Sequence, residues 1–147
     1  KLAFRDAVLI HGGGWKRMAD EKISNNVFKE TVERAIGITK VHNYYGMVEQ
    51  TGSIFFECEQ GYLHVPNVSD ISVVDQEFNA CDFGVTGVIK LCSVLPTSYP
   101  GNVILTDDIG LIVGEDGCRC GRLGKYFVVE GRLPQVEVRG CSDARFE

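Results

Sequence analysis

The sequence has no apolar run that approaches the ~18 residues of a membrane-spanning helix, and no basic segment followed by a short apolar one opens it. It also lacks an excess of positive charge, because 15 lysines and arginines stand against 20 aspartates and glutamates and give a net charge of −5. No basic stripe runs along the chain, which argues against a nucleic-acid partner. We therefore expect neither a membrane span nor a nucleic-acid ligand.

A length of 147 residues is enough for one domain with its own core, and the 17 glycines favour a loop-rich chain that wraps a ligand over a helical bundle. Six cysteines are an even number, as three disulfides of a secreted protein would need. Without a secretion signal we expect a reducing, cytoplasmic compartment, in which the thiols are metal ligands, buried apolar groups or a reactive nucleophile. They are Cys58, Cys81, Cys92, Cys118, Cys120 and Cys141.

The first fifty residues read as a strand, a glycine-rich loop, a helix and a second strand. Residues 1–10 are typical of a strand that runs into a glycine run. Residues 24–36 place apolar side chains on one helical face, with Ser24 as a cap and Gly37 as a terminator. The apolar run at 36–41 enters the next strand. This order predicts a βαβ unit with parallel strands.

A loop predicted at residues 42–52 combines residue types that suit a nucleotide. Tyr44 and Tyr45 offer flat faces for a base, Gly46 allows close approach of a backbone, and Glu49 is a hard oxygen ligand suited to Mg²⁺. Open α/β sheets bind ligands beyond the carboxyl ends of their strands, where this loop would lie. The alternative is an ordinary connection with two half-buried tyrosines and a solvated glutamate.

After Gly52 the pattern changes to short apolar runs separated by Gly, Pro, Asn and Asp. This pattern is typical of antiparallel strands in a small sheet or barrel. We therefore predict an α/β lobe over residues 1–52, followed by a β-rich lobe over residues 53–147. The expected strands of the second lobe are residues 53–57, 62–65, 71–74, 87–92, 110–113 and 126–130.

Three thiols and one imidazole are a standard tetrahedral shell for Zn²⁺. Cys58 and His64 form one pair close in sequence, and Cys118 and Cys120 form another. One ion held by two such pairs would staple distant hairpins together. The alternative is a hydrogen-bonded strand histidine with buried or free cysteines.

Two further groups could carry chemistry. Asp107 and Asp108 could clamp a diol such as a ribose, because an ionised carboxylate accepts two hydroxyl donors, although such pairs are more often ordinary turns. Cys141 follows a glycine near the end of the sequence, and Arg139 and Arg145 would favour its nucleophilic thiolate. The alternative for Cys141 is an unused cysteine.

Several segments resemble the motifs of the acyl-adenylate-forming superfamily. YGMVE at 45–49 is similar to its Tyr-Gly-x-Thr-Glu motif, LTDDIG at 105–110 to its Thr-Gly-Asp segment and GRLPQVEVRG at 131–140 to its hinge segment, while residues 11–15 stand where its adenine loop lies. With HGGGWK, LPTSYPG, GCRCGRLGKYF and VRGCSD added, the sequence resembles, nearly end to end, the acyl-protein synthetases of bacterial luminescence operons. It also resembles phenylacetate-CoA ligases, through YGMVE, CRCGR and VRG.

The resemblance implies a partial adenylate-forming fold, with the βαβ lobe beside the antiparallel sheet or barrel, and a nucleotide site within it. The implied adenine site consists of Gly12, Gly13, Gly14 and either Tyr44 or Tyr45. Glu49 would hold Mg²⁺ beside the α-phosphate of ATP, and Asp108, helped by Arg132, would take the ribose hydroxyls. Cys141 matches the cysteine on which the family carries its acyl group.

The implied reaction joins a fatty acid to ATP, giving acyl-AMP and pyrophosphate, and then transfers the acyl group to the Cys141 thiol. A reductase partner, of the acyl-CoA-reductase type, would take the acyl group from that thioester.

Three departures from the family pattern stand out: Val48 replaces the threonine of the motif, the hinge segment is short with Leu133 and Pro134 near its usual aspartate, and the phosphate loop and the N-terminal half are missing. We therefore expect the C-terminal part of a longer synthetase, inactive without its N-terminal half. The alternatives are an aryl- or acyl-CoA ligase of the phenylacetate-CoA ligase type and a non-catalytic, zinc-stapled binding module.

Overall fold

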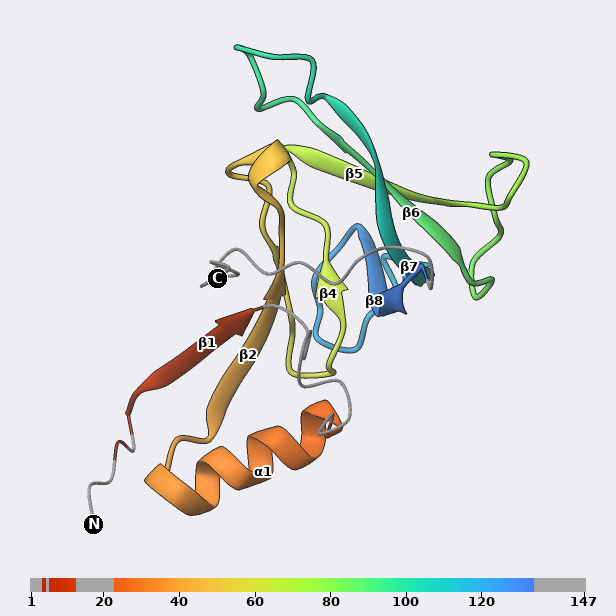
Figure 1. Cartoon of the computed structure of the whole chain (residues 1–147). Helices are drawn as coiled ribbons and strands as arrows, with labels where there is room; N and C mark the ends of the chain where they lie inside the picture. The colour runs from red at the N-terminus through yellow and green to blue at the C-terminus, as the bar shows by residue number, and fades with distance from the viewer. Residues whose placement is uncertain (1–3, 5, 13–22, 134–147) are drawn as a thin grey trace, which may run out of the picture.

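The fold begins with two parallel strands and a helix, and the computed structural model describes residues 4, 6–12 and 23–133 of the chain. β1 (Val8–Gly12) pairs in parallel with β2 (Lys40–Tyr45), and α1 (Asn25–Ile36) lies beside them (Figure 1). The βαβ unit and the parallel pairing predicted from the sequence are confirmed.

Both ends of α1 lie where the sequence predicts them. The Ser24 hydroxyl accepts a hydrogen bond from the Val27 N–H at 3.3 Å, and Gly37 adopts a φ of 79° and donates its N–H to the Glu33 carbonyl at 2.8 Å. A positive φ at this position favours glycine, which pays no steric penalty there. The helix has no fully buried side chain, and Val27 is 43% exposed. Apolar burial alone therefore holds α1 only weakly.

A buried carboxylate ties α1 to the first sheet. Glu57, directly after β3 (Phe55–Phe56), has a side chain only 2% exposed. Its carboxylate forms an ion pair with Lys29 Nζ at 2.9 Å, accepts the Asn43 backbone N–H at 2.8 Å and accepts the side-chain amide of Asn25. A buried charge is tolerated only when it is paired and hydrogen-bonded. Glu57 thus fixes the helix to β2 through partners on both elements.

β2 extends four residues into the predicted loop. The loop was expected from His42, yet the strand continues to Tyr45 because it pairs with β1 on one side and with β3 on the other, where Tyr44 faces Phe56 and Tyr45 faces Phe55. Both tyrosines therefore stand on a strand end with fixed, opposite directions. β3 follows Gly52 but belongs to the first sheet, and the lobe boundary at that glycine stays a prediction.

The second sheet is antiparallel and curls upon itself, with the strand order β4-β8-β7-β6-β5. Lys125 of β8 reaches across to β5, where its Nζ contacts Asp70 Oδ1 at 2.7 Å and the Ile71 carbonyl at 3.1 Å. The predicted small antiparallel sheet is present. Its strands are β4 (Leu63–His64), β5 (Ser69–Val74), β6 (Gly87–Ser93), β7 (Val103–Glu115) and β8 (Lys125–Arg132).

β7 is much longer than the strand predicted at residues 110–113. It runs for 13 residues because β6 pairs with its first part and β8 with its second, with a bulge near Gly110. A Cβ at Gly110 would lie 2.2 Å from the Val128 carbonyl oxygen, so only glycine allows this pairing. Asp107 and Asp108 consequently stand in a strand and not in a turn, with Asp108 facing Arg132 of β8.

The two sheets share one hydrophobic core. Phe55 of the first sheet and Phe127 of the second are both 0% exposed and meet edge to face, with ring centroids 5.4 Å apart. Tyr45 packs on both rings, with centroids 5.9 and 6.1 Å away. Among the described residues no helix is long and apolar enough to cross a membrane.

We expect Phe127→Ala to lower the free energy of unfolding by about 3–5 kcal/mol, because a fully buried ring is lost and a cavity remains. Urea unfolding followed by circular dichroism measures this change. The matched control is Val94→Ala, a truncation of a side chain 76% exposed, which should change the value by less than about 0.5 kcal/mol. Equal effects of the two substitutions would contradict a core centred on Phe127.

Candidate functional site

Gly12 and Tyr44 touch at the carboxyl ends of the two parallel strands. They are register partners, and a Cβ on Gly12 would lie 2.5 Å from Tyr44 Cε1, so the ring covers the glycine backbone. The Tyr44 ring is 37% exposed and lies 6.2 Å from the Phe56 ring. Two members of the predicted adenine site are therefore adjacent. Gly13 and Gly14 lie outside the described residues, as does Cys141.

Tyr45 points the other way and joins a charged network. Its hydroxyl donates to Asp108 Oδ2 at 2.7 Å, and Arg132 Nε lies 3.3 Å from Asp108 Oδ1. A second guanidinium nitrogen of Arg132 lies 3.7 Å from Asp107 Oδ2. Burial and the neighbouring Asp108 carboxylate raise the pKa of Tyr45 well above its ordinary value, which keeps the hydroxyl protonated and able to donate. The structure thus gathers Tyr45, Asp108 and Arg132, three predicted site residues.

Glu49 stands on the short 3-10 helix η2 (Val48–Gln50), with its side chain exposed. This loop is clamped to the second sheet. Gln50 is 1% exposed, and its Nε2 donates to the Gly101 carbonyl at 2.9 Å and to the Asn102 carbonyl at 3.3 Å. The Tyr99 hydroxyl donates to the Glu49 backbone carbonyl. Glu49 is therefore held by its backbone while its carboxylate faces solvent.

Sequence reasoning missed the role of Gln50. The signal available was the segment LPTSYPG at residues 95–101, which was noted only as a resemblance. It contains Tyr99 and Gly101, both partners of η2. A Cβ on Gly101 would lie 2.8 Å from the Glu49 carbonyl oxygen, so the glycine allows the hairpin to approach this loop closely.

The four predicted zinc ligands lie together. The ligand atoms of Cys58, His64, Cys118 and Cys120 are all within 4.8 Å of one another. Cys58 Sγ and Cys118 Sγ are 3.9 Å apart, and Cys120 Sγ is 3.3 Å from His64 Nε2. Two sulfurs bound tetrahedrally to one Zn²⁺ at about 2.3 Å would be about 3.8 Å apart. The donor set and its spacing therefore fit a single zinc ion.

Matching turns present these thiols. Gly61 donates its N–H to the Cys58 carbonyl at 2.9 Å, and Gly121 donates its N–H to the Cys118 carbonyl at 3.0 Å. Both glycines have φ values of 82°, so each cysteine opens a Cys-x-x-Gly turn that depends on its glycine. Desolvation lowers the pKa of His64, which favours the neutral ring that coordinates metals. The turns belong to the β3–β4 and β7–β8 connections.

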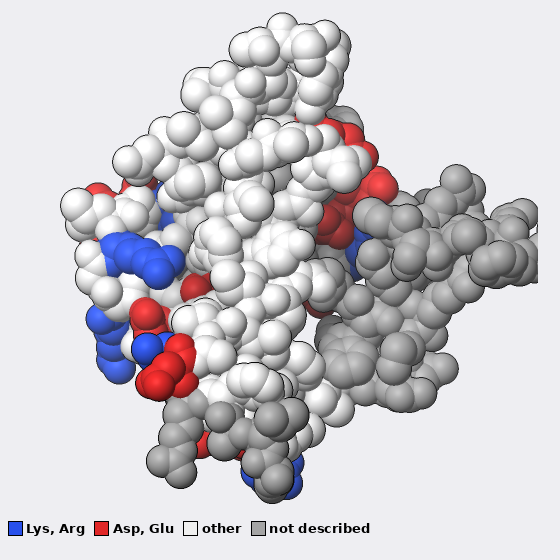
Figure 2. Space-filling model, turned by 90° about the vertical axis from the view of Figure 1, so that its left-hand side faces the viewer, with Lys and Arg blue, Asp and Glu red and all other residues white. Residues whose placement is uncertain are grey.

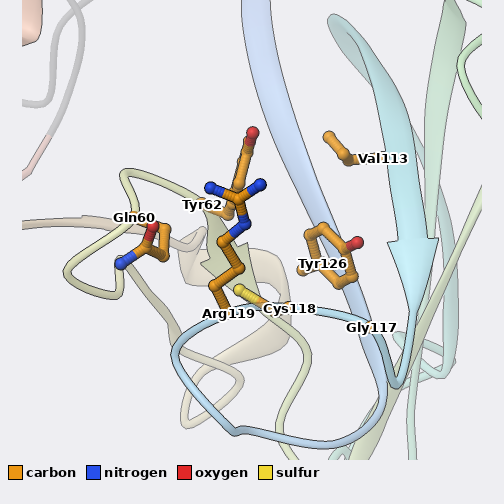
Figure 3. Close-up of a pocket in the computed structure, with 7 residues that line it drawn as sticks. All are labelled: Gln60, Tyr62, Val113, Gly117, Cys118, Arg119 and Tyr126. Atoms are coloured by element: carbon orange, nitrogen blue, oxygen red, sulfur yellow. The ribbon is translucent and has the colours of Figure 1, made fainter.

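A shallow hollow of about 360 Å³ lies beside this cluster (Figure 3). The rings of Tyr62 and Tyr126 lie 5.3 Å apart there, and Tyr126 also stacks on His64. The hollow is separate from Tyr45 and Asp108. Its lining residues are Gln60, Tyr62, Val113, Gly117, Cys118, Arg119 and Tyr126.

Comparison with known proteins identifies a family and several relatives of this chain. A sequence model of the acyl-protein synthetase family LuxE matches residues 3–147. The long-chain-fatty-acid–luciferin-component ligase of Vibrio harveyi is 28% identical over 145 residues, which are 94% of this chain and 36% of that protein. This chain thus spans about a third of the length of that curated relative.

Solved structures share the fold. The open form of 2-hydroxyisobutyryl-CoA ligase, in complex with 2-HIB-AMP and CoA, superposes with a TM-score of 0.70 at 21% identity, covering 87% of this chain and 28% of that one. The luciferase-like enzyme of the nonluminescent mealworm Zophobas morio superposes with a TM-score of 0.57 at 15% identity, covering 86% and 32%. The two parts of the chain therefore form a partial adenylate-forming-enzyme fold.

The raised pKa of Tyr45 predicts a pH-dependent contribution to stability. Because the folded pKa lies above the ordinary value, the contribution is fully present below about pH 10 and is lost as the pH rises through the folded pKa. The difference in unfolding free energy between wild type and Tyr45→Phe should therefore depend on pH. Above about pH 10, wild type should lose up to about 1.4 kcal/mol per pH unit relative to Tyr45→Phe. Chemical unfolding at pH 8 and at pH 11 measures it, and a difference that stays constant would contradict the buried contact.

Proposed function

The chain belongs to the acyl-protein synthetase family LuxE, and from this membership we propose that it forms the adenosine-binding part of an ATP-dependent ligase that activates a fatty acid. The network of Tyr45, Asp108 and Arg132, beside Gly12 and Tyr44, is the observation that carries the proposal. These residues come from both sheets and converge at the carboxyl ends of the parallel strands.

Asp108 suits the ribose. A carboxylate offers about four acceptor positions, of which the Tyr45 hydroxyl and Arg132 take two, so acceptor positions remain for a diol. Arg132 forms an ion pair with this carboxylate. We assign Tyr44, the more exposed of the two rings, to stack on the base, with the backbone of Gly12, Gly13 and Gly14 alongside.

Glu49 suits Mg²⁺. Among the described residues, no hydrogen-bond or ionic partner occupies its carboxylate, and a carboxylate oxygen is a preferred ligand of this hard cation. Bound Mg²⁺ would neutralise charge on the phosphates. Gln50 and Tyr99 keep Glu49 in place through its backbone, while Val48 supplies no hydroxyl to the phosphates.

The substrate proposal follows the relative from Vibrio harveyi, which is named for a long-chain fatty acid. An oxygen of the fatty carboxylate attacks the α-phosphorus of ATP; the bond to pyrophosphate breaks and acyl-AMP forms. The Cys141 thiolate then attacks the acyl carbonyl carbon, and AMP leaves with its oxygen. The resulting thioester is suited to a reductase-type partner protein, and a cytoplasmic location stays a prediction.

The rest of the site would come from the N-terminal half of a longer synthetase. Val8 and Ile10 of β1 are 53% and 52% exposed and alternate with His11, whose ring packs on Phe28 of α1. Parallel strands are usually covered on both faces. Seen from the side of β1, charged side chains lie at the margins of a largely uncharged face (Figure 2). We expect that half to cover this face, and the isolated chain to lack ATP-dependent activity.

We also propose that Cys58, His64, Cys118 and Cys120 hold one structural Zn²⁺. The ion would join the turn that follows the first sheet to the β7–β8 connection of the second sheet. This role is structural because the Tyr45–Asp108 network uses none of the four residues.

The function is tested in the longest synthetase that contains this sequence, with radiolabelled fatty acid and ATP. We expect ATP–pyrophosphate exchange and a thioester on the protein; Cys141→Ser should abolish the thioester and leave the exchange intact. The control is Cys92→Ser, which should retain both. Thioester formation on coenzyme A that is unaffected by Cys141→Ser would favour the acyl-CoA ligase, and absence of any exchange would favour the non-catalytic binding module.

Metal analysis tests the zinc proposal on the purified chain. One zinc per chain is expected, and chelation should expose three additional thiols to a thiol reagent and lower the melting temperature, because structural zinc contributes directly to folding. Cys118→Ser should lose the metal, whereas Cys81→Ser should keep it. A metal-free chain with unchanged thiol reactivity would rule out the site.

A further inference from the structure

We propose that Tyr45 is a positioning residue: it aims the Asp108 carboxylate at the two ribose hydroxyls and so makes the site selective for a ribonucleotide. The inference rests on the proposed nucleotide function and adds to it a specificity role for a side chain that was expected only to stack on a base.

Each carboxylate oxygen of Asp108 has its own partner. Tyr45 of β2 donates to Oδ2 at 2.7 Å, and Arg132 of β8 forms an ion pair with Oδ1, its Nε lying 3.3 Å away. These two partners come from different sheets, so the way the sheets meet constrains the orientation of the carboxylate. The Asp108 side chain is 17% exposed, which leaves an edge open to a ligand.

The backbone of Asp108 is held as well. Its N–H donates to the Thr106 hydroxyl oxygen at 3.1 Å. That hydroxyl in turn donates to the Ile89 carbonyl on β6 at 2.9 Å, and Thr106 is only 7% exposed. Asp108 is therefore anchored at its backbone by β6 and at its carboxylate by Tyr45 and Arg132.

Tyr45 has little freedom to move. Its ring packs against Phe55 and, edge-on, against Phe127, both of which are fully buried. An aromatic ring enclosed in this way keeps one rotamer, so its hydroxyl presents a fixed donor. Because burial and Asp108 raise the pKa of Tyr45, that donor persists at neutral and mildly alkaline pH.

A carboxylate with a fixed direction discriminates sharply. A site built to bond a hydroxyl rejects the analogue that lacks it, because a polar group is left unpaired. Without the Tyr45 hydroxyl, Asp108 can turn toward Arg132 and lose its alignment with the diol. Selectivity for ribose over deoxyribose should therefore fall more than the affinity for the base.

The experiment compares AMP, 2′-deoxy-AMP and 3′-deoxy-AMP by isothermal titration against the 147-residue chain. Wild type should prefer AMP over each deoxy form by about tenfold, the size of one well-placed hydrogen bond. Tyr45→Phe, which keeps the ring and removes only the hydroxyl, should reduce this preference to about twofold or less. Tyr62→Phe is the matched control and should leave the preference unchanged.

The outcomes separate the two proposals. If wild type prefers AMP and Tyr45→Phe keeps that preference, the positioning role is overturned while the nucleotide site stands. If wild type binds none of the three nucleotides, the nucleotide site is overturned and the role of Tyr45 falls with it.

A second measurement uses only the wild-type protein, so it tests the role of Tyr45 even if Tyr45→Phe does not fold. In wild type, the NMR resonances of the Tyr45 ring should shift when AMP is added and should shift far less with 2′,3′-dideoxy-AMP, because only the ribose hydroxyls engage Asp108. Equal shifts with the two nucleotides would overturn the role of Tyr45.

Discussion

The packing contact between Phe55 and Phe127 joins the two sheets, and the rest of the structure depends on it. Each ring is fully buried, one in the parallel-stranded sheet and the other in the curled antiparallel sheet. Edge-to-face aromatic pairs add about 0.5–1.5 kcal/mol to the burial of the rings themselves. The Tyr45 ring packs against both phenylalanine rings, and this packing places its hydroxyl within hydrogen-bond distance of Asp108. A change in the angle between the sheets would therefore move the Tyr45 hydroxyl relative to Asp108.

Three acidic side chains, Glu57, Asp108 and Glu49, differ in exposure and in the partners of their carboxylates, and this difference indicates a different role for each. Glu57 is buried and engaged by Lys29 and two hydrogen-bond donors, so nothing further can reach it. Asp108 is partly exposed and contacts the Tyr45 hydroxyl and Arg132, which orient its carboxylate without filling its acceptor positions. Glu49 is exposed and held only through its backbone. Glu57 therefore suits a structural role, Asp108 suits contact with a ligand, and Glu49 suits binding of a cation.

The cluster of three cysteines and one histidine is a second place where the two sheets meet. Cys58 follows the first sheet directly, His64 opens the second, and Cys118 lies in the β7–β8 connection. The ring pair links the two sheets by packing, and the bound Zn²⁺ that we propose would link them a second time through these side chains. The first sheet needs this support, because α1 buries little apolar surface against it.

Local patterns determined the parts of this protein that depend on near neighbours in the sequence. The helix limits at Ser24 and Gly37 follow from side chains a few residues apart. Tertiary structure alone decided the length of β7, the burial of Gln50 and the direction of Tyr45. Partners 63 residues apart, such as Tyr45 and Asp108, leave no trace in local periodicity. Their contact exists only because the two sheets pack together, and packing is a property of the whole chain.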